Sequence, residues 1–146
     1  MKTVGSLNEV AMELLKAVEC DRVTCEDVVL VESGPYYAQM LFNYGVILGE
    51  VVSNTYLTGS KRLTALQVNH LLDLGWSAPN TPCQSSCERP HPNFHRTWPD
   101  GVPSERIVRD LLASMISVCI RFEGEPLTFI REPRHGHPST GLPCNH

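Results

Sequence analysis

Three apolar segments between residues 28 and 54 are separated by very short reversals, and this spacing limits the folds open to the chain. The reversals carry the turn-forming sequences Ser-Gly-Pro at 33–35 and Asn-Tyr-Gly at 43–45. Parallel neighbours need a crossover of about a dozen residues or more, which neither reversal provides. The sequence therefore predicts three antiparallel strands joined as a meander, over residues 28–32, 36–44 and 46–54.

The side chains of the third predicted strand divide between two faces, because successive residues of a strand point to opposite sides. The alternation places Ile47, Gly49 and Val51 on one face. The other face holds Glu50 together with three aliphatic side chains, Val46, Leu48 and Val52. A carboxylate in that setting is either a buried functional acid or a group at the rim of the sheet that accepts a hydrogen bond from a backbone N–H.

Helical periodicity predicts amphipathic helices on either side of these strands. The first, over about 7–19, begins with a capping box formed by Ser6 and Glu9. The last begins near Pro103, a favoured residue in a first helical turn. Their apolar faces consist of Leu7, Val10, Ala11, Leu14, Leu15 and Val18 in the first helix and Ile107, Val108, Leu111, Leu112, Met115, Ile116 and Cys119 in the last.

A middle helix is marked at both ends. Thr64 is placed to be its N-cap, and Gln67 three positions later completes a capping box. Gly75 is placed to adopt the left-handed conformation that ends a helix, so that Trp76 folds back onto Leu71. This contact predicts a structural role for Trp76, against the alternative that Trp76 belongs to a binding site.

Together these elements predict an α+β fold in which about three helices cover one face of an antiparallel sheet. Residues 126–131 add a candidate edge strand to the meander. A proline-rich loop insert spans about residues 78–102. We expect a single domain over residues 1–131, followed by a flexible Pro/His-rich tail at 132–146.

Composition argues against several classes of function. The formal net charge is −4, and the lysines and arginines are scattered, which argues against nucleic acid as a partner. No apolar stretch reaches the ~20 residues needed to cross a bilayer. Glu9 and Glu13 fall where a signal peptide would be apolar. We therefore expect a cytoplasmic protein that does not bind membranes and keeps its cysteines reduced, with Cys20 and Cys119 buried as small apolar groups.

The segments YYAQMLFNYGVILGEVVSNTYL, RLTALQVNHLLDLGW and PNFHRTW, followed by an amphipathic helix, resemble the actinobacterial TY-Chap family over residues 35–122. That family is grouped with type III secretion chaperones and YbjN-like proteins. The resemblance implies a chaperone-like, non-enzymatic domain whose partner is another polypeptide. The insert CQSSCERPH and the tail after residue 132 depart from the family pattern.

Aromatic residues in the loop that follows the middle helix, together with two tyrosines at the start of the second predicted strand, suggest where a peptide would bind. We predict that Tyr36, Tyr37, Phe94 and Trp98 supply apolar contact and that Asn93, Arg96 and Glu50 orient the client backbone. On this hypothesis, replacing Phe94 and Trp98 by alanine removes binding and leaves the fold intact. The alternative is that Phe94 seals the core and that Arg96 stacks on Trp98 or pairs with Asp100.

Two sets of metal-ligating residues give a second hypothesis, a small zinc-stapled structural subunit. Thiolates and imidazoles with a C-x3-C-x3-H-x3-H spacing form a complete zinc ligand set, although the same residues also fit a polar surface loop. They are Cys83, Cys87, His91 and His95. A weaker set lies in the tail and consists of His135, His137, Cys144 and His146.

The sequence contains none of the common catalytic motifs, so we predict that the protein is not an enzyme. An enzyme lacking such a motif would require polar side chains converging around Glu50. Edge pairing by the strand near Phe129 would give a homodimer.

Overall fold

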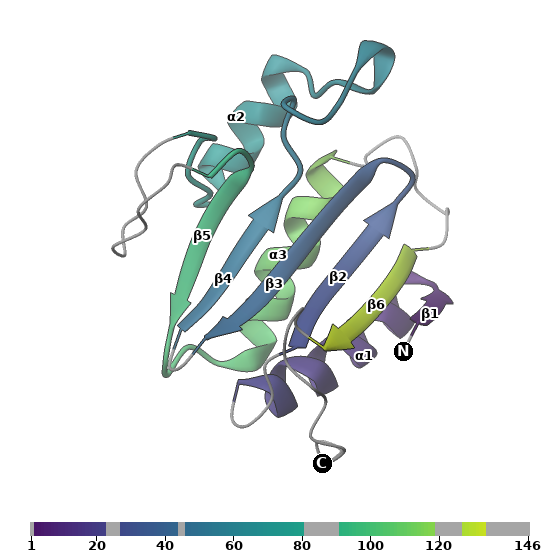
Figure 1. The fold of residues 1–146 in the computed structure, drawn as a ribbon, viewed down its shortest axis with the longest axis vertical. Coiled ribbons are helices and arrows are strands. Elements are labelled where there is room, and N and C mark those ends of the chain that lie inside the picture. The colour runs from purple at the N-terminus through teal and green to yellow at the C-terminus, as the bar shows by residue number, and fades with distance from the viewer. Residues whose placement is uncertain (1, 23–26, 44–45, 81–90, 119–126, 134–146) are drawn as a thin grey trace.

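The computed structural model describes residues 2–22, 27–43, 46–80, 91–118 and 127–133 (Figure 1). Within them, six strands form one antiparallel sheet in the order β1-β6-β2-β3-β4-β5, which confirms the α+β class. The strands are β1 (Lys2–Gly5), β2 (Asp27–Ser33), β3 (Tyr36–Asn43), β4 (Val46–Val51), β5 (Phe94–Pro99) and β6 (Leu127–Pro133). The helices are α1 (Leu7–Asp21), α2 (Ala65–Asp73), α3 (Ser104–Val118) and the short 3-10 helix η1 (Gly59–Lys61).

The predicted meander is confirmed by β2, β3 and β4, which pair in sequence order. Gly34 in the first reversal has a φ of +57°, a value that a residue with a side chain rarely adopts. The helix boundaries were also predictable. Ser6 and Thr64 both form the expected capping boxes. Gly75 adopts a φ of +103°, and the N–H of Trp76 donates to a carbonyl in the last turn of α2.

Helices α1 and α3 pack on the same face of the sheet (Figure 1). Alternation along the strands places one set of apolar side chains beneath the two helices, where it is fully buried. The sheet contributes Val29, Val31, Ala38, Met40 and Phe42, and the helices contribute Val10, Leu14, Ile107, Leu111 and Met115. No helix within the described ranges has the length and apolarity that a membrane span requires.

The prediction of a loop over residues 78–102 is wrong for its last part, because β5 lies within it. Phe94, Arg96 and Trp98 face the same side of this strand and alternate with His95 and Thr97. The arginine among the inward-facing residues breaks the apolar alternation by which a strand is recognised. The preceding part of the predicted insert, residues 81–90, lies outside the described residues.

The last strand was predicted at the edge of the sheet, but β6 lies inside it, between β1 and β2. Strand β1, which was not predicted, pairs with β6 on one side. Phe129 is completely buried. The proposed route to a homodimer, edge pairing by this strand, is therefore wrong. Residues 134–146 of the predicted tail lie outside the described residues.

The prediction of reduced cysteines is wrong for Cys20, which is disulfide-bonded. The other five cysteines lie outside the described residues. Arg131 holds the end of α1 to β6. Its guanidinium forms an ion pair of 2.6 Å with the buried Asp21 and contacts Cys20 Sγ at 3.1 Å. No local sequence pattern predicts this contact between distant elements.

Candidate functional site

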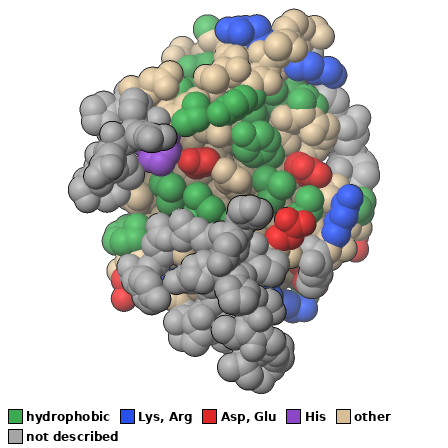
Figure 2. All heavy atoms as spheres, in the orientation of Figure 1, with side chains coloured by type: hydrophobic (Ala, Val, Ile, Leu, Met, Phe, Trp, Pro, Cys, Tyr) green, Lys and Arg blue, Asp and Glu red, His purple; other side chains and the backbone are tan. Residues whose placement is uncertain are grey.

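The face of the sheet opposite α1 and α3, called the open face here, is the candidate functional site. No helix among the described residues lies over it (Figure 1). Apolar side chains gather on this face and are interrupted by carboxylates (Figure 2). By strand register, the apolar side chains include Val4, Val28, Leu30, Tyr37, Leu41, Val46, Leu48 and Ile130. All are at least partly exposed, so the face combines apolar area with access to solvent.

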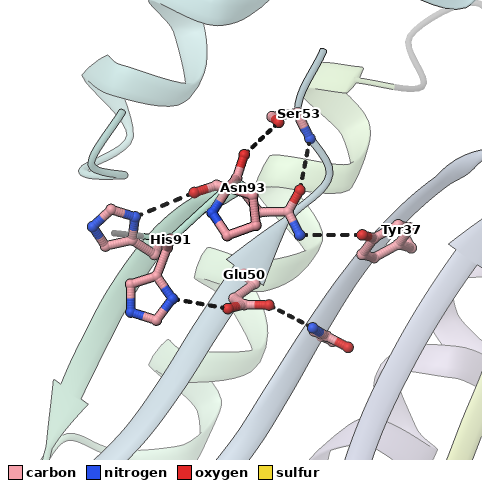
Figure 3. Close-up of polar contacts among 8 residues, drawn as sticks. Tyr37, Glu50, Ser53, His91 and Asn93 are labelled. Atoms are coloured by element: carbon pink, nitrogen blue, oxygen red, sulfur yellow. Dashed lines mark hydrogen bonds and ion pairs between the residues drawn. The ribbon is translucent and has the colours of Figure 1, made fainter. Parts of the chain in front are cut away.

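Glu50 lies on the open face beside Leu48, as the alternation of β4 predicted. Its two carboxylate oxygens have separate partners (Figure 3). Nε2 of Gln39 donates to one oxygen at 2.5 Å, and Nδ1 of His91 lies 3.2 Å from the other. The Glu50 side chain is 13% exposed. This carboxylate therefore joins β3, β4 and the segment before β5, and each of its oxygens has a partner within the protein.

Asn93 was predicted to bind the backbone of a client, but its carboxamide is bonded within the fold (Figure 3). Oδ1 accepts from the N–H of Ser53 at 3.1 Å, and Nδ2 donates to the hydroxyl of Tyr37 at 3.1 Å. Asn93 is only 4% exposed. The prediction of direct peptide contact by Asn93 is therefore not supported by its position, which instead joins the end of β4 to β3.

Tyr37 is the one predicted aromatic residue that lies on the open face, opposite Glu32 on β2. Burial raises the pKa of its phenol, and the hydrogen bond from Asn93 opposes that rise. Asn93 therefore fixes the hydroxyl, while the partly exposed ring remains at the surface. This arrangement leaves Tyr37 able to contact a bound segment through its ring.

The remaining predicted aromatic residues are buried, so the prediction that Phe94 and Trp98 are presented from a loop is wrong. Phe94 and Trp98 are each 2% exposed, and Tyr36 is 1% exposed with its hydroxyl donating to the carbonyl of Lys61 at 2.9 Å. The predicted alanine substitutions at Phe94 and Trp98 would therefore empty the core, and they cannot separate binding from folding. The alternative, that Phe94 seals the core, agrees with the structure.

Arg96 belongs to the same buried cluster and not to the open face. Its guanidinium stacks over the rings of Trp98 and Trp76, with its central carbon 4.8 Å and 5.6 Å from the ring centroids. Stacking on Trp98 was the alternative considered from sequence. The ion pair is with Asp110, at 3.6 Å, and not with the predicted Asp100. Burial lowers the pKa of the guanidinium, and Asp110 opposes that shift. This cluster ties the end of α2 to β5 and α3.

The predicted zinc ligands are only partly within the described residues. His91 and His95 lie side by side, with ring centroids 4.7 Å apart, whereas Cys83 and Cys87 lie outside the described residues. Nε2 of His91 is buried and has no hydrogen-bond partner among the residues that the structure covers. Those residues contain no group of three or more side chains able to hold a metal ion. The tail set also lies outside them. Zinc binding stays a prediction.

Sequence reasoning missed several open-face residues, above all Leu30, Gln39 and Leu41. In β2 and β3, as in β4, every second residue points to the open face. Applying this alternation to the first two predicted strands would have identified them. The face opposite the helices could then have been traced from Glu50 to its cross-strand neighbour Gln39.

An antiparallel sheet with helices on one face and an apolar, partly exposed opposite face defines an α+β domain with one accessible sheet face. The chain matches the family TY-Chap3, described as "T3SS (YopN, CesT) and YbjN peptide-binding chaperone 3", over residues 12–122. The chain therefore belongs to this family, as its resemblance indicated. Membership implies a peptide-binding chaperone role with a polypeptide partner. No curated protein and no solved structure matched the chain.

Proposed function

We propose that the protein binds a segment of another polypeptide on the open face, by non-covalent contacts and without catalysing a reaction. The observation that carries this proposal is an apolar sheet face that no described helix covers, in a chain of a peptide-binding family. Monomeric proteins rarely leave a contiguous apolar patch exposed unless it meets a partner. Leu30, Leu41 and Leu48 would supply most of the apolar contact.

The residues first predicted to bind the peptide then divide into two groups. Tyr37 and Glu50 lie on the open face and would border the bound segment. The others pack or form hydrogen bonds within the protein and stabilise the sheet; they are Tyr36, Asn93, Phe94, Arg96 and Trp98. Binding would use a preformed surface, because these buried contacts fix the strands that present it.

A test uses the full chain and an array of short synthetic peptides that samples apolar, charged and mixed sequences. Wild-type protein should retain a subset of the peptides. Leu41→Asp and Leu48→Asp should each weaken binding at least about tenfold, because a carboxylate facing an apolar client must lose its water. Met12→Asp is the matched control, since Met12 is exposed on α1, in the opposite layer. Unfolding midpoints would show that all three variants are folded.

Two results would contradict the proposal. One is a wild-type chain that retains no peptide from the array. The other is binding that survives in Leu41→Asp and Leu48→Asp but is lost in Met12→Asp, which would move the binding surface to the helical layer.

We also propose that the protein acts in the cytoplasm. Membership in a family of peptide-binding chaperones supports this proposal. The disulfide at Cys20 makes an oxidising compartment the competing location, because disulfides are rare in reducing compartments. Cell fractionation separates the two locations. The protein should be recovered in the cytoplasmic fraction, and recovery in a secreted or periplasmic fraction would contradict the proposal.

A further inference from the structure

We propose that the segment bound by the open face is basic and apolar in alternation, with a lysine or arginine at every fourth position and an apolar residue midway between them. This inference rests on the proposed function, because it names the class of segment that the same face receives. It follows from where the carboxylates lie among the apolar residues of the face.

Two carboxylates lie on either side of an apolar pair along β2 and β6. Leu30 of β2 lies opposite Ile130 of β6 in the register. Glu32 follows Leu30 by two residues on β2, whereas Glu132, on β6, lies opposite Val28. The two carboxylates are thus four register positions apart on one face, or about 13 Å along the strands. The apolar pair lies midway between them.

Both carboxylates are available to a ligand. Glu32 is partly exposed and Glu132 is exposed. Neither forms a hydrogen bond or an ion pair with another residue in the described ranges. Glu50 differs, because Gln39 and His91 already occupy its oxygens. A bound segment could therefore pair with the carboxylates of Glu32 and Glu132, whereas the carboxylate of Glu50 already has partners within the protein.

The positive charge on this face is small. Of the lysines and arginines in the described ranges, the register places Lys2 on the open face, on the edge strand β1. Arg131 lies opposite Val29, on the helical side, and binds Asp21. Lys2 lies directly opposite Ile130, on the outer strand, whereas Glu32 and Glu132 lie on either side of the apolar pair along the strands. The two carboxylates outnumber the single lysine, so the net charge around Leu30 and Ile130 is negative. Such a surface favours cationic partners and rejects anionic ones.

The spacing specifies the pattern of the client as well as its charge. In an extended chain, residues i, i+2 and i+4 point to the same side, and positions i and i+4 are about 13 Å apart. Two basic residues at i and i+4 therefore match the separation of Glu32 and Glu132. The residue at i+2 then lies over Leu30 and Ile130, where an apolar side chain buries the most area. The aliphatic stems of lysine add to this contact.

The test uses fluorescein-labelled synthetic peptides and the full chain, with binding followed by fluorescence anisotropy. The probe is three repeats of Lys-Thr-Leu-Thr, which puts every lysine and leucine on one side of an extended chain. Three matched peptides change one property each. Glu-Thr-Leu-Thr repeats reverse the charge, Ser-Thr-Leu-Thr repeats remove it, and Lys-Leu-Thr-Thr repeats keep the composition but place lysine and leucine on opposite sides. The Lys-Thr-Leu-Thr peptide should bind tightest, and its affinity should fall at about 0.5 M NaCl.

Single variants test the two carboxylates. Glu32→Gln and Glu132→Gln should each weaken binding of the Lys-Thr-Leu-Thr peptide about 2- to 5-fold and reduce its salt dependence, as expected for one partly exposed ion pair. Glu19→Gln is the matched control, because it makes the same change in charge at an exposed position of α1, in the opposite layer. Its affinity should equal that of the wild type.

The outcomes separate the two proposals. If the serine or glutamate peptide binds as tightly as the lysine peptide, and Leu41→Asp abolishes that binding, the charge inference fails while the proposed function stands. Equal affinity for the Lys-Leu-Thr-Thr peptide overturns the spacing. If no peptide binds but the chain dimerises, and Leu41→Asp disrupts the dimer, the face belongs to a second copy of the chain and both proposals fail.

Discussion

Gly49 of β4 lies on the helical side of the sheet, where the structure leaves no room for a side chain. A Cβ atom built at this position would lie 2.5 Å from Cζ3 and 2.6 Å from Cη2 of Trp98, and 3.1 Å from Cη2 of Trp76. The Trp98 ring cannot easily withdraw. Its Nε1 donates to Asp110 at 3.1 Å, and its edge packs against Trp76 with centroids 5.9 Å apart. Gly49→Ala should therefore overpack the core.

The expected cost of Gly49→Ala is about 2 kcal/mol in the free energy of unfolding. Overpacking typically costs 1–3 kcal/mol, and the rigid tryptophan places this site at about the upper end. Replacing a strand glycine by alanine returns about 0.5–1 kcal/mol of backbone entropy. For a chain of 146 residues, the net loss corresponds to a fall of about 6 °C in Tm. Urea denaturation at constant m-value measures the free energy directly.

Two further variants make the argument specific to the clash. Val46→Ala, an exposed position on the same strand, should change stability by less than about 0.5 kcal/mol. In the background of Trp98→Phe, whose smaller ring lacks the clashing atoms, Gly49→Ala should cost at least about 1 kcal/mol less than in the wild type. A loss below about 0.5 kcal/mol for Gly49→Ala alone, or equal losses in both backgrounds, would refute the reasoning.

Three other predictions concern Asn93, Tyr37 and the predicted zinc ligands. Asn93→Ala leaves the N–H of Ser53 without its buried acceptor and should cost about 1–3 kcal/mol in urea denaturation; an unchanged midpoint would show that the bond is dispensable. Because the pKa of Tyr37 is raised in the folded state, the unfolded chain loses that proton first as pH rises, so stability should fall above about pH 10. Tyr37→Phe should flatten this fall between about pH 9 and 11, and an identical slope would contradict the assignment. The zinc-stapled alternative predicts one zinc per chain, lost in Cys83→Ser; elemental analysis of untagged protein would reject it if wild type lacks stoichiometric metal.

Local signals explain how much of the fold could be predicted. The capping residues Ser6 and Thr64 act within one helical turn, and Gly34 and Gly75 have the positive φ angles that their turns require. The α+β class and the meander follow from such short-range rules. Strand β5 was missed because its inner face includes Arg96. That charge is stabilised by Trp98 on the same strand and by Trp76 and Asp110 from other elements.

Contacts between distant segments explain what could not be predicted. The position of β6 inside the sheet depends on β1, a four-residue strand with little apolar pattern of its own. The carboxamide of Asn93 is chemically suited to bind a peptide backbone, but its partners are Ser53 and Tyr37, which lie 40 and 56 residues away in the sequence. The alternation of β4 did place Glu50 correctly. Which face the helices cover depended on tertiary packing.

The central claim is that the open face of the sheet receives a polypeptide segment. The most direct measurement is an NMR titration of the isotope-labelled full chain with the peptide of three Lys-Thr-Leu-Thr repeats. We expect the amide signals of β2, β3 and β4 to shift, with Leu30, Leu41 and Leu48 among the most affected, while Met12 on α1 stays unchanged. Shifts confined to α1 and α3 would contradict the account.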